Sequence, residues 1–172
     1  MPAIERAHLL APSVAAALAG RSPESVLVAE IDPELADTAA FCARYGVTPG
    51  QSANCVVVAG RRGGTTTLAA CVVLATTRAD VNGLVRRRLD ARKASFAPMD
   101  VAVAASGMEH GGITPVGLPG GWPVLVDAAV VAQPWVVIGS GVRRSKLVVP
   151  GALLASLPGA EVVDGLGVPV PT

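Results

Sequence analysis

The sequence is organised around one segment, Gly111-Gly112-Ile113-Thr114-Pro115-Val116-Gly117-Leu118-Pro119. Its three glycines and two prolines cannot continue a helix or a central strand, because proline lacks the amide donor and glycine loses too much backbone entropy there. The segment is therefore predicted to be a loop. Several of its amides carry no bulky side chain, so they can approach the carbonyl or phosphate of a ligand closely. Composition alone leaves two interpretations open, an ordinary Gly/Pro connection and the wall of a substrate site.

Upstream of this loop, two Val-rich apolar runs predict a β-hairpin. The runs are Cys55 to Ala59 and Leu68 to Ala75, and the Gly-rich link Gly60-Arg61-Arg62-Gly63-Gly64 suits a turn between paired strands. Asp32-Pro33 and Asp80 are typical helix starts, because an aspartate accepts hydrogen bonds from the free amides of a first turn. The expected helices cover 13–19, 32–46, 80–89 and 98–107, and further strands are expected over 25–31 and 93–96.

Downstream of the loop, strands are predicted over 122–126, 135–138 and 146–149, and a short helix is predicted from Pro150. Strands and helices are interleaved irregularly, which differs from a regular βαβ repeat. The expected fold class is therefore mixed α/β (α+β-like), with a mixed sheet flanked by helices. The chain 1–172 is expected to be a single domain, with a loosely held tail over 158–172.

Composition and charge restrict the class of protein. Apolar residues make up 51% of the chain, but no uninterrupted apolar run is long enough to span a bilayer, so no membrane partner is expected. Cys42, Cys55 and Cys71 lack the spacing of a disulfide framework or a zinc site, which favours a reducing cytoplasm and predicts no metal and no cofactor. The net charge is +1, yet residues 61–146 alone sum to +6. This basic middle predicts a phosphate-binding patch if its cations converge; otherwise they are solvated surface charges.

The order of motifs carries more information than any single one. A helix ends at Gly46, and a Pro49-Gly50 turn precedes a Val-rich strand. A helix that begins at an aspartate follows, and after it come the 111–119 loop, two strands and Gly139-Ser140-Gly141. Over roughly residues 35–157 this order resembles the YbaK/ProX-type prolyl-tRNA editing family. The resemblance implies a single domain with a curled, mixed β-sheet. It also implies hydrolysis of amino acids wrongly esterified to tRNA, in a pocket bounded by a Gly-x-x-x-Pro segment, here 111–115 or one residue later.

One position departs from the family pattern. The resemblance implies a lysine that points into the pocket from the start of the strand after the Pro-Gly turn, and here that position is Asn54. An asparagine offers only a neutral amide, and charge-assisted hydrogen bonds are about twice as strong as neutral ones. The chain has two lysines, Lys93 and Lys146, and either is a candidate for a spatial substitute. Ester hydrolysis needs a positioned water or a substrate hydroxyl and donors for the oxyanion, so it does not strictly require a protein nucleophile.

Other nucleophiles and bases have weaker support. Cys55 follows Asn54 in a strand, so it is predicted to face the other side as a buried, inert thiol. Glu109-His110 lies beside the loop, where it is either a titratable group at the pocket mouth or a solvated pair at a helix end.

The primary hypothesis is a trans-acting aminoacyl-tRNA deacylase, and the alternative is a related domain that binds tRNA or another ligand without catalysis. The expected partners are the aminoacyl-tRNA acceptor end and a synthetase. The predicted catalytic positions are Asn54 and Gly112. The predicted substrate-binding residues are Gly111, Ile113, Thr114, Pro115, Gly117, Gly139, Ser140 and Gly141. The predicted tRNA-steering cations are Arg86, Arg87, Arg143, Arg144 and Lys146.

Overall fold

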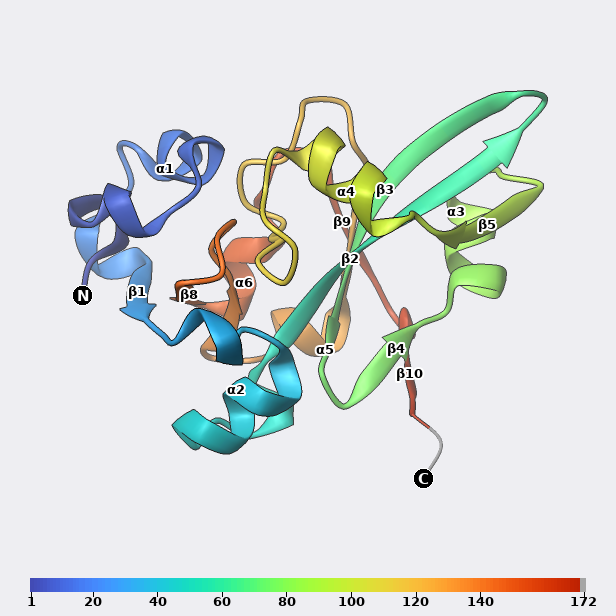
Figure 1. Cartoon of the computed structure of the whole chain (residues 1–172). Coiled ribbons are helices and arrows are strands. Elements are labelled where there is room, and N and C mark those ends of the chain that lie inside the picture. The colour runs from blue at the N-terminus through green and yellow to red at the C-terminus, as the bar shows by residue number, and fades with distance from the viewer. Residues whose placement is uncertain (171–172) are drawn as a thin grey trace.

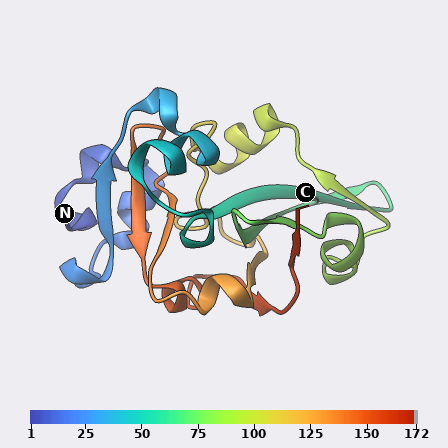
Figure 2. The same cartoon turned by 90° about the horizontal axis from the view of Figure 1, so that it is seen from below.

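A long β-hairpin is the central element of the fold. The computed structural model describes residues 1–170, in which β2 (Ala53–Arg62) and β3 (Thr65–Leu74) pair antiparallel along their whole length. Gly63 and Gly64 have φ angles of 56° and 80°, as in a type I′ turn, whose twist matches that of a hairpin. The hairpin spans most of the molecule's length (Figures 1 and 2). The predicted hairpin is confirmed. β2 extends beyond its apolar run at both ends, and β3 begins at Thr65, before its run, and ends at Leu74, one residue short of it.

Three strands join the hairpin in a mixed sheet. Within residues 1–170 the strand order of this sheet is β5-β2-β3-β6-β9. The added strands are β5 (Lys93–Phe96), antiparallel to β2; β6 (Val124–Asp127), parallel to β3; and β9 (Ala160–Val163), parallel to β6. Every residue of β6 is buried, as expected for a strand with parallel neighbours on both sides. The expected mixed sheet is therefore confirmed.

A smaller antiparallel sheet packs beside the start of the hairpin. Its strand order is β1-β8-β7, with β1 (Leu27–Glu30), β8 (Ser145–Val149) and β7 (Val136–Gly139). A single bridge between Ser52 and Val137 connects β7 to the residue that precedes β2. The largest hydrophobic cluster takes side chains from both sheets, including Val72, Val126 and Leu147. The two sheets therefore meet where β2 begins.

Short helices surround the sheets. They are α1 (Pro12–Leu18), α2 (Thr38–Tyr45), α3 (Arg86–Arg88), α4 (Met99–Ser106), α5 (Ala128–Val131) and α6 (Gly151–Leu154). The Asp80 carboxylate caps the π-helical turn Val81–Val85 that leads into α3, accepting from the amides of Gly83 and Leu84 at 3.1 and 3.0 Å. A β-carbon at Gly83 would lie 2.5 Å from that carboxylate, which explains a glycine inside the predicted helix.

The helix predicted from Asp32 is interrupted. Asp32 caps only a 3-10 turn, Pro33–Leu35, and α2 starts separately at Thr38 before ending at the left-handed Gly46, as predicted. Between the two, Asp37 has an extended backbone with ψ of 136°, which cannot continue a helical turn. The interruption leaves the carbonyl of Ala36 available to a side chain from another element.

The prediction of a loosely held tail over 158–172 is partly wrong. Residues 160–163 form β9, and β10 (Gly167–Pro169) pairs with β4 (Thr77–Ala79). Leu166 is fully buried, and the Gly167 amide donates to the Asp127 carboxylate at 2.9 Å. Strand pairing and burial therefore fix most of this segment; residues 171 and 172 lie outside the described part. No helix within residues 1–170 combines the length and apolar character needed to cross a bilayer.

Candidate active site

A cavity of about 250 Å³ lies where the two sheets meet, and segments far apart in the sequence form its wall. Its lining residues are Ala36, Asp37 and Thr38 before and at the start of α2, Ser52 to Val56 at the start of β2, Met99 at the start of α4, His110, Gly111 and Ile113 from the loop region, Ile138 and Gly139 of β7, and Lys146 of β8. The wall combines small residues such as Ala36, Ala53, Gly111 and Gly139 with the polar side chains of Asn54 and Lys146.

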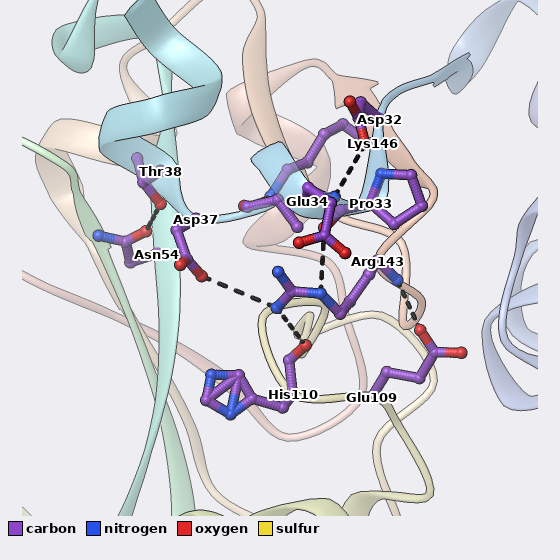
Figure 3. A network of polar contacts seen from close by, with 11 residues as sticks. Asp32, Pro33, Glu34, Asp37, Thr38, Asn54, Glu109, His110, Arg143 and Lys146 are labelled. Carbon is purple, nitrogen blue, oxygen red and sulfur yellow. Dashed lines mark hydrogen bonds and ion pairs between the residues drawn. The ribbon is translucent and has the colours of Figure 1, made fainter.

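Asn54 lies in the cavity wall and is held by α2. Its Oδ1 accepts a hydrogen bond of 2.6 Å from the Thr38 hydroxyl (Figure 3). This bond orients the amide, and no protein acceptor within the described residues takes a hydrogen bond from its nitrogen. Asn54 is half-buried. It therefore offers two neutral N–H donors for a ligand.

Lys146 reaches the same cavity from β8. It was predicted to be a surface cation that steers tRNA, but the residue is only 8% exposed, so this prediction is corrected. Its cross-strand partners are Gly139 on β7 and Ala29 on β1, and strand alternation places it on the cavity side of the small sheet. Its Nζ donates to the Ala36 carbonyl at 2.9 Å and lies 5.4 Å from the centroid of the Phe41 ring.

The pKa of Lys146 is lowered, chiefly because burial removes water from the ammonium group. The positive charge of Arg143 also lowers this pKa, while the carboxylate of Asp37 and the thiol of Cys42 raise it. None of the ion pairs formed within residues 1–170 includes Lys146.

Arg143 holds the rim of the cavity together. Its Nε donates to the Pro33 carbonyl at 3.1 Å, and its Nη1 donates to the His110 carbonyl at 3.0 Å and lies 3.8 Å from Asp37 Oδ1 (Figure 3). Gly111 leaves room for this guanidinium, because a β-carbon there would lie 2.4 Å from Nη1. Arg143 therefore has a structural task at the rim in addition to any contact with RNA.

The 111–119 loop is divided between two places. Gly111 and Ile113 line the cavity, whereas Gly112 lies behind them, where a β-carbon would be 2.8 Å from the backbone of Val142. Pro115 and Gly117 line a separate hollow near Trp122. The hydroxyl of Thr114 is buried and has no hydrogen-bond partner among residues 1–170. Only the first part of the loop is therefore a wall of this cavity.

The Gly139-Ser140-Gly141 segment is divided in the same way. Gly139 lines the cavity. The Ser140 hydroxyl is buried, and its oxygen lies 3.1 and 3.0 Å from the backbone carbonyl oxygens of Val142 and Ser145, which share its single proton as acceptors. A β-carbon at Gly141 would lie 2.4 Å from the side chain of Ala11. Ser140 and Gly141 thus shape the backbone behind the cavity and do not line it.

The remaining predicted cations lie away from the cavity. Arg144 donates to the carbonyl of His8 in the N-terminal segment. Arg86 lines a hollow of about 360 Å³ with Arg61, Arg92 and Lys93 near the hairpin tip, and Arg87 is exposed nearby on α3. Arg61 follows Asn54 by seven residues along β2, which corresponds to roughly 23 Å. The basic middle of the sequence therefore separates into a rim cation, a cavity cation and a distant cluster.

Sequence reasoning did not select Asp37, Thr38 or Met99, all of which line the cavity. The available signal was the sequence Asp37-Thr38, which is typical of a helix N-terminus. The sequence analysis instead placed these two residues inside one longer helix over 32–46. Cys55 packs against the main core, and burial raises the pKa of its thiol, which makes it a poor nucleophile at neutral pH. Within residues 1–170, no group of three His, Cys, Asp or Glu side chains is placed to hold a metal ion.

The chain is similar in fold to proteins of known structure. A protein from a study of epitope backbone grafting by computational design matches with a TM-score of 0.74 and 25% identity over 90% of this chain and 95% of that one. A candidate trans-editing enzyme for prolyl tRNA synthetase matches with a TM-score of 0.73 and 24% identity over 90% of this chain and 97% of that one. These likenesses establish the fold. No curated protein matches the chain. The family model for the aminoacyl-tRNA editing domain matches residues 32–157, most of the sequence, and the chain therefore belongs to that family.

Proposed function

We propose that this protein is a trans-acting deacylase that hydrolyses the ester of mischarged, prolyl-type tRNA. The observation that carries the proposal is the shared cavity, which joins Asn54, Gly111, Ile113 and Gly139 from separate parts of the chain. Family membership supports a deacylase-type activity. The likeness to a candidate trans-editing enzyme for prolyl tRNA synthetase supports action on tRNA that such a synthetase has charged. The proposal implies a cytoplasmic protein, because tRNA is charged there.

The size of the cavity favours a small aminoacyl group. About 250 Å³ accommodates an alanyl ester and part of its ribose more readily than a large side chain. A synthetase whose pocket accepts a larger amino acid cannot exclude a smaller one strongly, because a missing methylene changes binding by only about 1–3 kcal/mol. Alanine attached to a proline tRNA is therefore the expected substrate.

The cation cluster near the hairpin tip is the proposed contact for tRNA phosphates. Arg61, Arg92 and Lys93 are exposed around the same hollow as Arg86. β5 runs antiparallel to β2, from Lys93 opposite Arg61 to Phe96 opposite Val58, so this edge strand leads from the cluster toward the start of β2 and the cavity. Phe96 is 56% exposed. An aromatic face followed by cations is a suitable surface for an unpaired 3′ end and its adjoining phosphates.

The test is deacylation of a panel of mischarged tRNAs by the purified protein. We expect release of alanine from proline tRNA above the rate in buffer, and little release of the cognate proline. Correctly charged alanine tRNA serves as the control for RNA specificity. Absence of deacylation for every member of the panel would overturn the proposal.

The second candidate is a domain that binds tRNA without catalysis, and the neutral side chain at Asn54 is the observation that favours it. It predicts binding without turnover, with an affinity that falls steeply as salt concentration rises. The same panel, measured by filter binding in parallel with deacylation, separates the two candidates.

A further inference from the structure

Lys146 is a buried cation that lines the cavity, and it forms no ion pair with any residue from 1 to 170. One of its three N–H donors is used by the Ala36 carbonyl at 2.9 Å. The Asp37 carboxylate is directed instead toward Arg143, at 3.8 Å, with a side chain that is 70% exposed. The described contacts therefore leave two N–H donors of the ammonium group without a protein acceptor, on a residue that lines the cavity.

The ammonium group of Lys146, whose contacts are the Ala36 carbonyl and the Phe41 ring, is incompletely stabilised in its buried position. A neutral carbonyl and an aromatic face replace only part of the hydration that burial removes. The lowered pKa of Lys146 is consistent with this deficit. An anionic oxygen entering the cavity would supply the missing charge, and its interaction would be strong because little water screens it.

Two anionic oxygens of an aminoacyl-tRNA end could approach this group, a phosphate of the terminal nucleotide and the oxyanion that develops at the ester carbonyl. The phosphate keeps a full charge throughout and is well solvated near the surface, whereas Lys146 is only 8% exposed. The ester is the group that must enter the cavity. The depth of Lys146 thus favours the ester oxygen.

We propose that Lys146 stabilises the oxyanion of the ester-hydrolysis transition state, so that the positive charge of this site comes from β8 and not from the β2 position that Asn54 occupies. This inference rests on the proposed deacylase function. Asn54 lines the same cavity and contributes its neutral amide as an additional donor. Two ammonium groups in a cavity of about 250 Å³ would repel each other, so a lysine at one position disfavours a lysine at the other.

The chemical step is an ordinary hydrolysis with water as the co-reactant. The water oxygen bonds to the carbonyl carbon, and the π electrons move to the carbonyl oxygen, whose negative charge Lys146 Nζ stabilises through hydrogen bonds. Collapse of this intermediate breaks the bond to the ribose oxygen. That oxygen takes one proton of the water and becomes the free hydroxyl of the tRNA, while the amino acid leaves as its carboxylate with release of the second proton.

The test compares Lys146→Met with Arg78→Met, an exposed cation outside the site. On a tRNA that the wild type hydrolyses, we expect Lys146→Met to lower kcat by about 10²- to 10³-fold, as removal of an oxyanion donor does elsewhere, with KM changed by less than about threefold. Arg78→Met should match the wild type. The double variant Asn54→Lys/Lys146→Met should regain at least about tenfold in kcat, while Asn54→Lys alone should lower it. Thermal unfolding verifies that each variant is folded.

A binding measurement separates this inference from the proposed function. The probes are an anionic phosphonate analogue of alanyl-adenosine and its neutral amide analogue. We expect Lys146→Met to weaken phosphonate binding at least about tenfold and to leave amide binding nearly unchanged. Unchanged kcat in Lys146→Met, a rise in KM alone, or equal loss of both analogues would overturn the inference while the deacylase function stands. If the wild type hydrolyses no tRNA, the function falls, and the phosphonate measurement still decides whether Lys146 binds an anion.

Discussion

Gly139→Ala tests whether the cavity wall depends on a close approach of two backbone segments. Gly139 pairs with Lys146 in the small sheet, and a β-carbon added to it would point at the loop. A β-carbon at this position would lie 2.6 Å from the Gly112 carbonyl oxygen and 2.8 Å from that of Ile113. The first oxygen would have to move by about 0.8 Å to reach the 3.4 Å of an ordinary contact. Both oxygens belong to backbone, so rotation of a side chain cannot relieve the overlap.

The expected magnitudes follow from this displacement. Overpacking in a well-packed region destabilises a protein by about 1–3 kcal/mol, and the smaller backbone entropy of alanine in the unfolded chain offsets about 0.4–1 kcal/mol. We therefore expect a net loss of about 1–2 kcal/mol, or roughly 2–8 °C in Tm for a chain of this length. A shift approaching 1 Å at a reacting centre lowers activity by up to about 10²-fold, so kcat/KM should fall roughly 30- to 100-fold.

The assay combines urea unfolding with deacylation of proline tRNA mischarged with alanine, by Gly139→Ala and by a matched control. Gly120→Ala is that control, because a β-carbon at Gly120 meets no atom within 4 Å and its φ angle is not in the left-handed region. The control should unfold within about 0.5 kcal/mol of the wild type and keep its activity. If Gly139→Ala also keeps both its stability and its kcat/KM, the contact between β7 and the loop does not shape the site, and the reasoning is refuted.

Three further predictions concern other parts of the molecule. Asp80→Ala removes a cap with two hydrogen bonds and should destabilise the fold by about 1–2 kcal/mol in thermal unfolding, with kcat/KM unchanged because Asp80 does not line the cavity. Burial lowers the pKa of Lys146 in the folded protein below the ordinary lysine value of 10.5. At pH values between the folded-state pKa and 10.5 the unfolded chain therefore binds more protons, and the unfolding free energy should rise with pH in that window. Urea titrations of Lys146→Met should lack this rise. Arg61→Glu/Lys93→Glu should raise KM for tRNA and flatten its salt dependence, with kcat retained; an unchanged salt slope would contradict the assignment of this cluster to phosphates.

The parts of the fold that sequence reasoning predicted are those with local causes. The Gly63-Gly64 link requires positive φ angles at two successive residues, and a glycine after α2 suits the left-handed end of that helix at Gly46. The Asp80 cap depends on amides only three and four residues away. Each of these signals acts within a few residues of the chain, so its meaning does not depend on the rest of the fold.

The parts that sequence reasoning missed depend on pairing between distant segments. The tail residues 160–163 have a sequence that suits an exposed strand or a loop, and only pairing with β6 orders them. The helix expected from Asp32 is interrupted at Asp37, beside a carbonyl that accepts from a lysine 110 residues away. A run of basic residues likewise does not reveal which cation turns inward. These outcomes are set by tertiary contacts, which override local propensity.

Lys146 gives the cavity a cation, although the residue at the start of β2 that lines the same cavity is the neutral Asn54. The wall of the cavity comes from the beginnings of α2 and β2, the loop, β7 and β8, so any of these elements can direct a side chain into the same space. A cation on β8 is anchored by the Ala36 carbonyl, and that carbonyl is free because the chain does not continue helically through Asp37. The interruption before α2, the neutral amide of Asn54 and the burial of Lys146 are therefore parts of one arrangement. The charge of the cavity depends on its three-dimensional wall, and a single strand position does not determine it.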